Sequence, residues 1–358
     1  VSSAHFLTAY IGLELLSLSL YAMIALRRDS GRSAEAALKY FVLGALASGL
    51  LLYGISMVYG ATGSLDFASV LASAANKQAN EWLLKLGVVF IVVAIAFKLG
   101  EVQFHMWVPD VYDGAPNSVT AFVGTAPKIA AVVFAFRILI TGMETIHSDW
   151  APMLAILAVA SLVVGNLAAI MQTIIKRMLA YSTVSHMGFI LLAFMAGAVG
   201  FTAGLYYAIT YAVMAAVSFG VLMVLSTKDI ECEDIKDLAG LNQRHAWFAF
   251  LRLLSMFSMA GIPPLMGFYA KFGVIMALLK QGYGGLSVFA VIMSRIGAFY
   301  YLRVIKVIYF DAPDHDQPVG SNYAAKFFLS VTAFLLILWG IMPQTVIDWC
   351  ARALENTL

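Results

Sequence analysis

The stretch LLKLGVVFIVVAIAFKLGEVQFHMWV, residues 83–108, combines a long apolar run with charged side chains in its second half. An apolar run of about 20 residues is what an α-helix needs to cross a hydrocarbon core about 30 Å thick. Because backbone groups in lipid must be satisfied internally, such runs predict an all-α, polytopic transmembrane helix bundle of roughly ten helices. The predicted helices are 4–26, 38–59, 83–108, 117–141, 151–173, 183–201, 203–226, 246–279, 284–309 and 325–349.

The composition agrees with a membrane protein and excludes a soluble enzyme. Of the 358 residues, 62% are hydrophobic and 12% are charged, whereas soluble domains carry about 25% charged residues. The net charge of +2 lies mostly in short loops, so no nucleic-acid partner is expected. Cys232 and Cys350 fall on opposite predicted sides of the membrane, so a disulfide between them is not expected, and no metal-ligand spacing is present.

Two of the predicted helices are expected to be interrupted inside the membrane. The span 246–279 contains Gly261-Ile262-Pro263-Pro264 near its middle, and the span 83–108 runs into Trp107-Val108-Pro109. Proline removes a backbone donor and clashes with the preceding turn. Such breaks persist in a membrane only where the freed backbone groups meet protein or a water-filled cavity.

Lysine and arginine are unequally divided between alternate loops, which predicts the orientation. The richer set is predicted to be cytoplasmic, so the C-terminus is expected outside. The richer set is Arg27, Arg28, Arg32, Lys39, Lys176, Arg177, Lys228, Lys236, Arg244, Arg303, Lys306 and Lys326, and the poorer set is Lys77, Lys85, Lys280, Arg352 and Arg137.

Ionisable residues inside the apolar spans are the candidate functional residues, because a charge at a helix centre costs about 2.5–3.5 kcal/mol on insertion scales. They favour an ion or proton path in which the charges face each other or water. These residues are Glu14, Lys98, Glu101, His105, Lys128, His186, Arg252, Lys271 and Arg295.

The spacing of some candidates suggests how they are arranged. Lys98, Glu101 and His105 are spaced i, i+3 and i+7, so they are predicted to share one helix face. Lys271 follows the predicted 261–264 break by about two turns, and an ionisable residue beside a broken helix is typical of transporter sites near the midplane. Lysine suits a proton relay, because burial and a nearby carboxylate change its proton affinity in opposite directions.

Structural roles remain open for several of these residues. Glu101 is also consistent with a local ion-pair partner of Lys98, without a role in transport. His105 and His186 are also consistent with hydrogen-bonded core histidines. The two arginines, Arg252 and Arg295, are also consistent with structural pairing or with snorkelling toward the interface.

Short strings along the whole chain carry a family resemblance. They are GLEL (12–15), FKLG (97–100), FHMWVPDVY (104–112), GAP (114–116), TAPK (125–128), IKRMLAYSTVSH (175–186), AGIPP (260–264), GFYAKF (267–272) and AFYYLR (298–303). Together they resemble the antiporter-like membrane subunits of respiratory complex I.

The resemblance implies a fold of two inverted five-helix repeats, each containing a broken helix. The chain looks like helices five to fourteen of that plan. The implied parts are a partial first repeat of four helices at 1–141, a second repeat at 151–309, and a final helix and tail at 325–358.

The resemblance also implies roles for individual residues. Glu14 and Lys98 correspond to the acid–lysine pair of the first half-channel. Lys128 corresponds to the central lysine, His186 lies on the connecting hydrophilic axis, and Lys271 corresponds to the lysine of the second half-channel. A lysine at this last position favours one of the three complex I paralogues.

The implied activity is proton translocation in the bacterial inner membrane, driven by electron transfer from NADH to quinone in other subunits. The chain would be one subunit of a translocase, with no cofactor or metal of its own and with other membrane subunits and lipid as its partners. Alternatives are a subunit of a multi-subunit Na⁺/H⁺ antiporter, a membrane-bound hydrogenase subunit, and a non-conducting structural subunit.

The sequence departs from the family pattern at four positions. Glu101 and Gln103 stand where an apolar residue and a proline are expected, and Arg252 and Arg295 stand where apolar residues are usual. The added charges are consistent with altered proton affinity along the path and also with a disabled channel.

Overall fold

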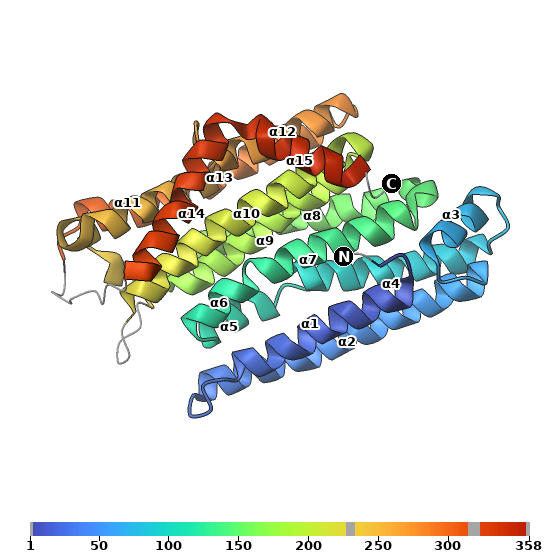
Figure 1. The fold of residues 1–358 in the computed structure, drawn as a ribbon, viewed down its shortest axis with the longest axis horizontal. Coiled ribbons are helices and arrows are strands. Elements are labelled where there is room, and N and C mark those ends of the chain that lie inside the picture. Colours follow the sequence, from blue (N-terminus) through green and yellow to red (C-terminus); the bar gives the residue numbers. More distant parts are fainter. Residues whose placement is uncertain (1–2, 227–232, 314–322, 356–358) are drawn as a thin grey trace.

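The computed structural model describes residues 3–226, 233–313 and 323–355. Over these ranges the chain forms an elongated bundle, with α1 and α2 on one side, α8 to α10 in the middle and α11 to α15 on the other side (Figure 1). The α-helices are α1 (Phe6–Ile24), α2 (Gly31–Thr62), α3 (Phe67–Ala75), α4 (Glu81–Leu99), α5 (Trp107–Gly114), α6 (Asn117–Val123), α7 (Ala126–Phe136), α8 (His147–Met171), α9 (Ile175–Met195), α10 (Ala198–Leu225), α11 (Leu241–Ala260), α12 (Met266–Lys280), α13 (Gly284–Phe310), α14 (Tyr323–Ile341) and α15 (Pro343–Glu355).

Within the described ranges, nine segments are long and apolar enough to cross a membrane. The tenth predicted crossing, 246–279, is the helix pair α11 and α12. The expected all-α membrane bundle is therefore confirmed. The division into repeats at 1–141 and 151–309, with a final segment at 325–358, stays a prediction.

The predicted break in the second half of the chain is present. Helix α11 ends at Ala260, Gly261 adopts a left-handed φ of 86°, and α12 begins at Met266. A left-handed residue at a helix C-terminus is usually glycine, because in other residues the Cβ atom lies too close to the carbonyl oxygen.

The first half also contains a break, and it overturns one prediction. Helix α4 ends at Leu99, Gly100 has φ of 80°, and α5 begins only at Trp107. Glu101 and His105 therefore lie in the break rather than on the same helix face as Lys98. The spacing argument failed because it assumed helical φ and ψ angles through Gly100.

The break shapes the packing around it. A Cβ added at Gly100 would lie 2.5 Å from Val108 Cγ2, so glycine also permits the close return of the chain. Gln103 takes a φ of 76°, which is unusual for a residue with a side chain.

Other boundaries also differ from the prediction. The span 117–141 is divided between α6 and α7 and ends in a π-helical turn at Arg137–Thr141. Helix α9 starts at Ile175 rather than 183, because the charged side chains of Lys176 and Arg177 in its first turn form hydrogen bonds with residues 110–115. The span 325–349 is divided before Pro343, since proline cannot continue the hydrogen-bond pattern of the preceding helix.

The two ends of the bundle carry different connections. One end, the α1–α2 end, holds the α1–α2 and α8–α9 connections and the described residues 233–240 before α11, and an ion pair of 3.2 Å joins Arg32 and Glu233 there. At the opposite end, Lys85 and Asp149 are 3.2 Å apart. The two predicted groups of lysine and arginine residues follow this division over the described residues, and Lys228 lies outside them.

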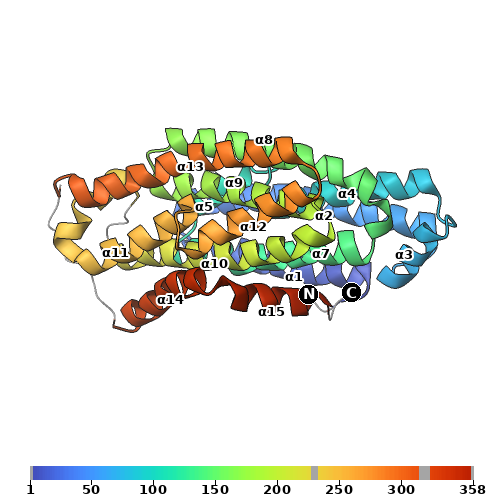
Figure 2. The same cartoon turned by 90° about the horizontal axis from the view of Figure 1, so that it is seen from above.

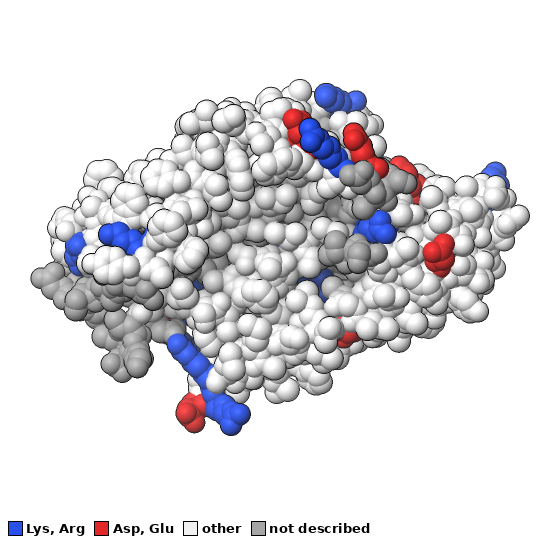
Figure 3. All heavy atoms as spheres, in the orientation of Figure 1, with Lys and Arg blue, Asp and Glu red and all other residues white. Residues whose placement is uncertain are grey.

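Much of the surface between the ends is uncharged, and the charged side chains on the visible face form small separate groups (Figure 3). Cys350 is a buried free thiol near the opposite end, whereas Cys232 lies outside the described residues. The expected absence of a disulfide between them stays a prediction.

Candidate functional site

The predicted acid–lysine pair is formed between α1 and α4. Lys98 Nζ lies 3.6 Å from Glu14 Oε1 and donates a hydrogen bond of 2.7 Å to Ser17 Oγ. The Ser48 hydroxyl, on α2, donates to the same carboxylate. The Lys98 side chain is only 5% exposed and that of Glu14 is 21% exposed, so the pair lies at the edge of the protein interior. A carboxylate and one hydroxyl therefore hold the buried amine, and a second hydroxyl holds the carboxylate.

Lys128, on α7, reaches across to the end of α4. Its Nζ donates to the carbonyl oxygen of Leu99 at 2.7 Å and to that of Lys98 at 3.4 Å, and it lies 4.8 Å from the centre of the Trp107 ring. The last carbonyls of a helix lack intrahelical partners and form the negative end of its dipole. The break in α4 therefore supplies a neutral but electronegative site for a buried amine.

Glu101 is fully buried within the same break. Neither of its carboxylate oxygens accepts a hydrogen bond that meets ordinary distance and angle limits from the residues described in the structure. The Ser161 hydroxyl of α8 lies next to it and accepts from the Val102 backbone N–H at 2.8 Å. Glu101 also interacts electrostatically with Lys128. The carboxylate is thus associated with the central lysine rather than with Lys98.

His186 lies on α9 within a buried group of hydroxyl side chains. Its Nδ1 is 2.8 Å from the Tyr207 hydroxyl, and its Nε2 is 3.0 Å from the Tyr301 hydroxyl. Tyr301 in turn is hydrogen-bonded to the Ser182 hydroxyl. Both ring nitrogens are therefore hydrogen-bonded, an arrangement that allows a proton to arrive at one nitrogen and leave from the other.

Lys271, on α12, repeats the arrangement of Lys128 at the second break. Its Nζ donates to the carbonyl oxygen of Ala260, the last residue of α11, at 3.1 Å and to Ser294 Oγ at 3.0 Å. It also lies 5.6 Å from the centre of the Phe189 ring, which stacks on Tyr207. Lys271 is therefore held by neutral acceptors and is separated from the His186 network by one aromatic ring.

The secondary candidates have different surroundings. His105 lies in the α4–α5 break near Tyr181, with ring centres 6.1 Å apart. Arg252 is fully buried on α11 and donates to the Ser218 carbonyl oxygen of α10. Arg295 points outward from the middle of α13. The structure therefore brings Arg295 to none of the other candidates.

Sequence analysis missed the hydroxyl side chains that surround the charged residues. Tyr207, Tyr301 and Ser294 lie on spans that read as apolar overall. The pairs Tyr206-Tyr207 and Tyr300-Tyr301 are a usable signal, because buried tyrosine hydroxyls need hydrogen-bond partners.

An ion-pair cluster lies where α5 meets α2 and α9. Asp110 accepts from Lys39 at 2.8 Å and from Arg177 at 2.9 Å. Burial raises the pKa of the Asp110 carboxyl, but the hydrogen bonds from Lys39 and Arg177 more than compensate and hold that pKa below its ordinary value. The buried Lys176 amine donates to the carbonyls of Asp113 and Ala115. These contacts allow α9 to begin in a charged segment.

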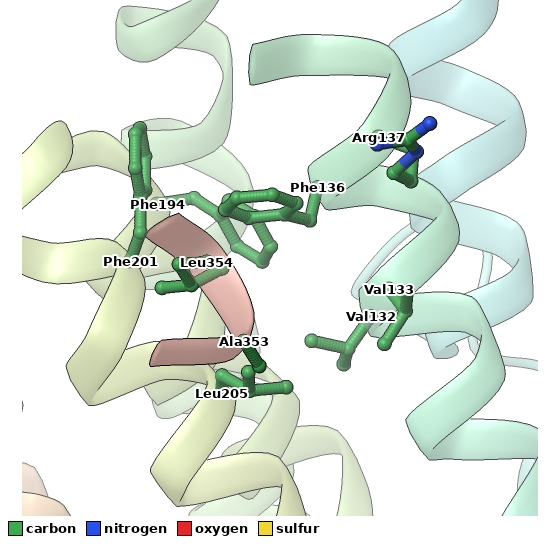
Figure 4. Close-up of a pocket in the computed structure, with 9 residues that line it drawn as sticks. All are labelled: Val132, Val133, Phe136, Arg137, Phe194, Phe201, Leu205, Ala353 and Leu354. Carbon is green, nitrogen blue, oxygen red and sulfur yellow. The ribbon is translucent and has the colours of Figure 1, made fainter. Parts of the chain in front are cut away.

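A separate apolar pocket of about 270 Å³ lies between α7, α10 and α15 (Figure 4). Among the described residues that line it, Arg137 alone is charged, and it donates to the Ser3 carbonyl oxygen at 2.7 Å. None of the proton-path candidates lines this pocket. Its lining residues are Val132, Val133, Phe136, Arg137, Phe194, Phe201, Leu205, Ala353 and Leu354.

The fold and these buried charges agree with the comparison with known proteins. Residues 3–297 match the family described as NADH:quinone oxidoreductase/Mrp antiporter, TM. The chain belongs to this family. The predicted resemblance to antiporter-like subunits is thereby confirmed.

Within the NADH:quinone oxidoreductase/Mrp antiporter family, the chain is similar to proteins of one type, subunit N of NADH-quinone oxidoreductase. The NADH-quinone oxidoreductase subunit N of Neisseria gonorrhoeae is 80% identical over 359 residues, which cover 100% of this chain and 75% of that protein. The subunit N of Laribacter hongkongensis is 57% identical and is matched over 74% of its length by the whole of this chain. Both relatives are subunit N proteins, and subunit N is the complex I paralogue that a lysine at position 271 indicates.

Solved structures confirm the membrane fold. A chain of respiratory complex I from Thermus thermophilus superposes with a TM-score of 0.84 at 33% identity, covering 97% of this chain and 75% of that chain. A chain of the Mrp complex from Dietzia sp. superposes with a TM-score of 0.88 at 22% identity, covering 99% of this chain and 74% of that chain. The second comparison shows the fold alone.

Proposed function

We propose that this chain carries protons through Glu14, Lys98, Lys128, His186 and Lys271, as the subunit N type of membrane subunit in NADH:quinone oxidoreductase. The sequence similarity to subunit N proteins supports the complex and the activity. The route rests on one structural observation. Buried lysine amines donate hydrogen bonds to the last carbonyl groups of two interrupted helices, which have no intrahelical partner.

The Glu14–Lys98 pair is the point at which the route is controlled. When Glu14 remains beside Lys98, its negative charge favours the protonated amine. Separating the pair lowers the proton affinity of Lys98, and a tenfold change in that affinity corresponds to about 1.36 kcal/mol. Moving one elementary charge against 100 mV costs about 2.3 kcal/mol. A change of about a hundredfold in the proton affinity of Lys98 is therefore large enough to drive transport.

The middle of the route combines lysine and histidine. Lys128 binds the carbonyl oxygen of Lys98 itself, so a change in the α4 end reaches both amines. No hydrogen bond joins Lys128 to His186 among the described residues, so proton transfer between them requires water or side-chain motion. Tyr207, which is hydrogen-bonded to His186, stacks on Phe189, and the Phe189 ring lies next to Lys271.

Glu101 adds a second carboxylate to this route. Because it is buried and interacts with Lys128, it serves as the acid partner of the central lysine. Glu101→Gln keeps the shape of the side chain and removes its charge. The proposal expects slower NADH-driven acidification and an altered pH dependence in this variant. Unchanged acidification across the pH range would leave Glu101 with a structural role only.

The unequal distribution of lysine and arginine supports an orientation in which the α1–α2 end faces the cytoplasm. The C-terminus, near the opposite end, would then lie outside, and protons would move from the α1–α2 end to the opposite end. The groups that surround the buried lysines are hydroxyls, backbone carbonyls, the Glu14 carboxylate and aromatic rings, and the hydroxyls and the carboxylate suit proton transfer. We therefore assign electron transfer and all redox cofactors to other subunits.

The test uses the full-length protein in its native membrane. Lys271→Ala is compared with Lys280→Ala, a matched control because Lys280 is exposed at the end of the same helix. NADH oxidation and NADH-driven acidification are recorded in inverted vesicles. The proposal expects Lys271→Ala to lose acidification, with oxidation slowed or uncoupled, while Lys280→Ala pumps normally.

Two results would overturn the proposal. Full acidification in Lys271→Ala would give Lys271 a structural role. Sodium-dependent acidification without NADH would instead favour the Na⁺/H⁺ antiporter alternative, which shares the fold.

A further inference from the structure

The outer face of α13 carries a regular stripe of exposed side chains. Val288, Ile292, Phe299 and Leu302 are 61%, 50%, 58% and 46% exposed, respectively. With Arg295 between them, the spacing alternates between four and three residues. This alternation is the repeat with which one helix packs along another over several turns. The opposite face of α13 is buried against the bundle through residues that include Gly297, Tyr300 and Tyr301.

Arg295 is the exceptional member of this stripe. It lies eleven residues after the start of α13, or about 16 Å along a helix with a rise of 1.5 Å per residue. In a hydrocarbon core about 30 Å thick, that distance places Arg295 near the middle. Its side chain points away from the bundle, and no hydrogen bond or ion pair joins it to another residue of 3–226, 233–313 or 323–355.

A lipid-facing arginine at this depth would be costly. Arginine at the centre of a membrane helix is unfavourable by about 2.5–3.5 kcal/mol even on insertion scales, and charged residues inside membranes almost always pair or face a polar interior. None of the residues that the structure describes pairs with Arg295, so we look for its partner on a neighbouring membrane helix. The chain works beside other membrane subunits, which makes a neighbouring helix available.

We propose that the outer stripe of α13 is a docking surface for a transmembrane helix of a neighbouring membrane subunit, one that carries an aspartate or glutamate at the depth of Arg295. The apolar members of the stripe pack along that helix, and the carboxylate neutralises the guanidinium. A carboxylate is the acceptor whose two oxygens match the two parallel N–H groups of arginine.

The surface also adjoins the proton route. Ser294, the residue before Arg295, accepts the hydrogen bond from Lys271 Nζ. Figure 2 shows α13 beside α8, on the face opposite α14 and α15. The neighbouring subunit would therefore contact the helix that supplies a hydroxyl partner to Lys271.

The proposal rests on assembly with other membrane subunits and not on the proton route, so it is tested by assembly. Arg295→Glu, Arg295→Leu and Arg295→Lys are made in the full-length protein and expressed with the whole complex. Lys306→Gln is the matched control, because Lys306 lies on the same helix but is 70% exposed near its end and pairs with Asp311. Intact complex is measured by native electrophoresis of gently solubilised membranes.

Arg295→Glu is expected to lose most of the intact complex, because it opposes two carboxylates inside the membrane. Arg295→Leu should lose less, while Arg295→Lys and Lys306→Gln should retain it. Intact complex in Arg295→Glu would overturn the proposal.

A second measurement identifies the occupant. A photoreactive benzoylphenylalanine at Phe299 is expected to cross-link this chain to a transmembrane helix of another subunit that contains an acidic residue. Cross-linking to lipid only, to a second copy of this chain or to another part of the same subunit would overturn the proposal. Because neither readout requires proton transport, failure here is distinct from failure of the proposed route.

Discussion

The two helix breaks hold their lysines in different electrostatic surroundings. In the first half, Lys98 lies beside the carboxylate of Glu14, and a second carboxylate, Glu101, lies within the break. In the second half, the hydrogen-bond acceptors of Lys271 among the described residues are a carbonyl and a hydroxyl. Neutral acceptors stabilise a protonated amine less than a carboxylate does. On the proposed route, this difference would let the first half retain a proton and the second half release it.

The largest expected effect comes from removing each lysine in turn. Lys98→Met leaves the partly buried Glu14 carboxylate without its cation, which places its cost near the low end of the roughly 3–5 kcal/mol observed for broken buried pairs. Lys271→Met leaves only neutral groups unsatisfied, at about 1–3 kcal/mol. Thermal stability of the purified complex should therefore fall more in Lys98→Met. Adding Glu14→Gln to Lys98→Met should restore part of the loss.

The glycines that end α4 and α11 give the next effect. Both have left-handed φ angles, for which a side chain costs roughly 1–2 kcal/mol. At Gly100 the added Cβ would also lie 2.5 Å from Val108 Cγ2, whereas at Gly261 it meets the flexible Lys271 chain at 3.1 Å. Gly100→Ala should therefore reduce the amount of assembled complex more than Gly261→Ala, as measured by native electrophoresis. Equal losses would contradict this difference.

The serine hydroxyls that accept hydrogen bonds from Lys98 and Lys271 allow the two halves to be compared by their effect on proton transport. Ser17→Ala leaves Lys98 with Glu14, whereas Ser294→Ala leaves Lys271 with the Ala260 carbonyl alone. A hydrogen bond to a charged group contributes about 1.5–3 kcal/mol. NADH-driven acidification should therefore slow more in Ser294→Ala than in Ser17→Ala. The reverse order would place proton release in the first half.

The smallest effect is expected outside the membrane route, at the ion pairs of Asp110. The pKa of this carboxyl is lowered in the folded protein, so its contribution to stability is present above the ordinary aspartate pKa of about 3.9. That contribution is lost as the pH falls through the lowered pKa. Because the side chain is 29% exposed, Asp110→Asn should cost no more than about 1 kcal/mol. Thermal unfolding at neutral pH should detect this loss, and the loss should disappear in strong acid.

Much of the fold follows from local sequence. Apolar runs of membrane length locate most helices, and Pro263-Pro264 locates the second break. The first break was only partly anticipated, because Gly100 and the backbone after it depart from helical geometry without a proline between 99 and 106. The start of α9 was missed since its charged residues are satisfied by α5, which is distant in sequence.

The candidate site was predictable to a similar degree. Charges inside apolar spans have so high a cost in lipid that their presence alone singles out Glu14, Lys98, Lys128 and Lys271. Their partners are not readable in the same way, because serine, tyrosine and carbonyl groups are common throughout the chain. Spacing placed Glu101 beside Lys98 on a helix, whereas the break turns it toward Lys128.

Composition, apolar run length and the placement of charges within apolar runs are local properties, and they are sufficient to predict a membrane bundle whose buried charges favour an ion or proton path. Hydrogen-bond partners depend on which helices meet, and that is settled only when all helices pack together. Tertiary structure therefore decided that Lys128 and Lys271 bind the ends of broken helices, that His186 joins two tyrosines, and that Arg295 faces outward. The physical reason is that a helix sequence specifies its own faces, whereas packing specifies what each face meets.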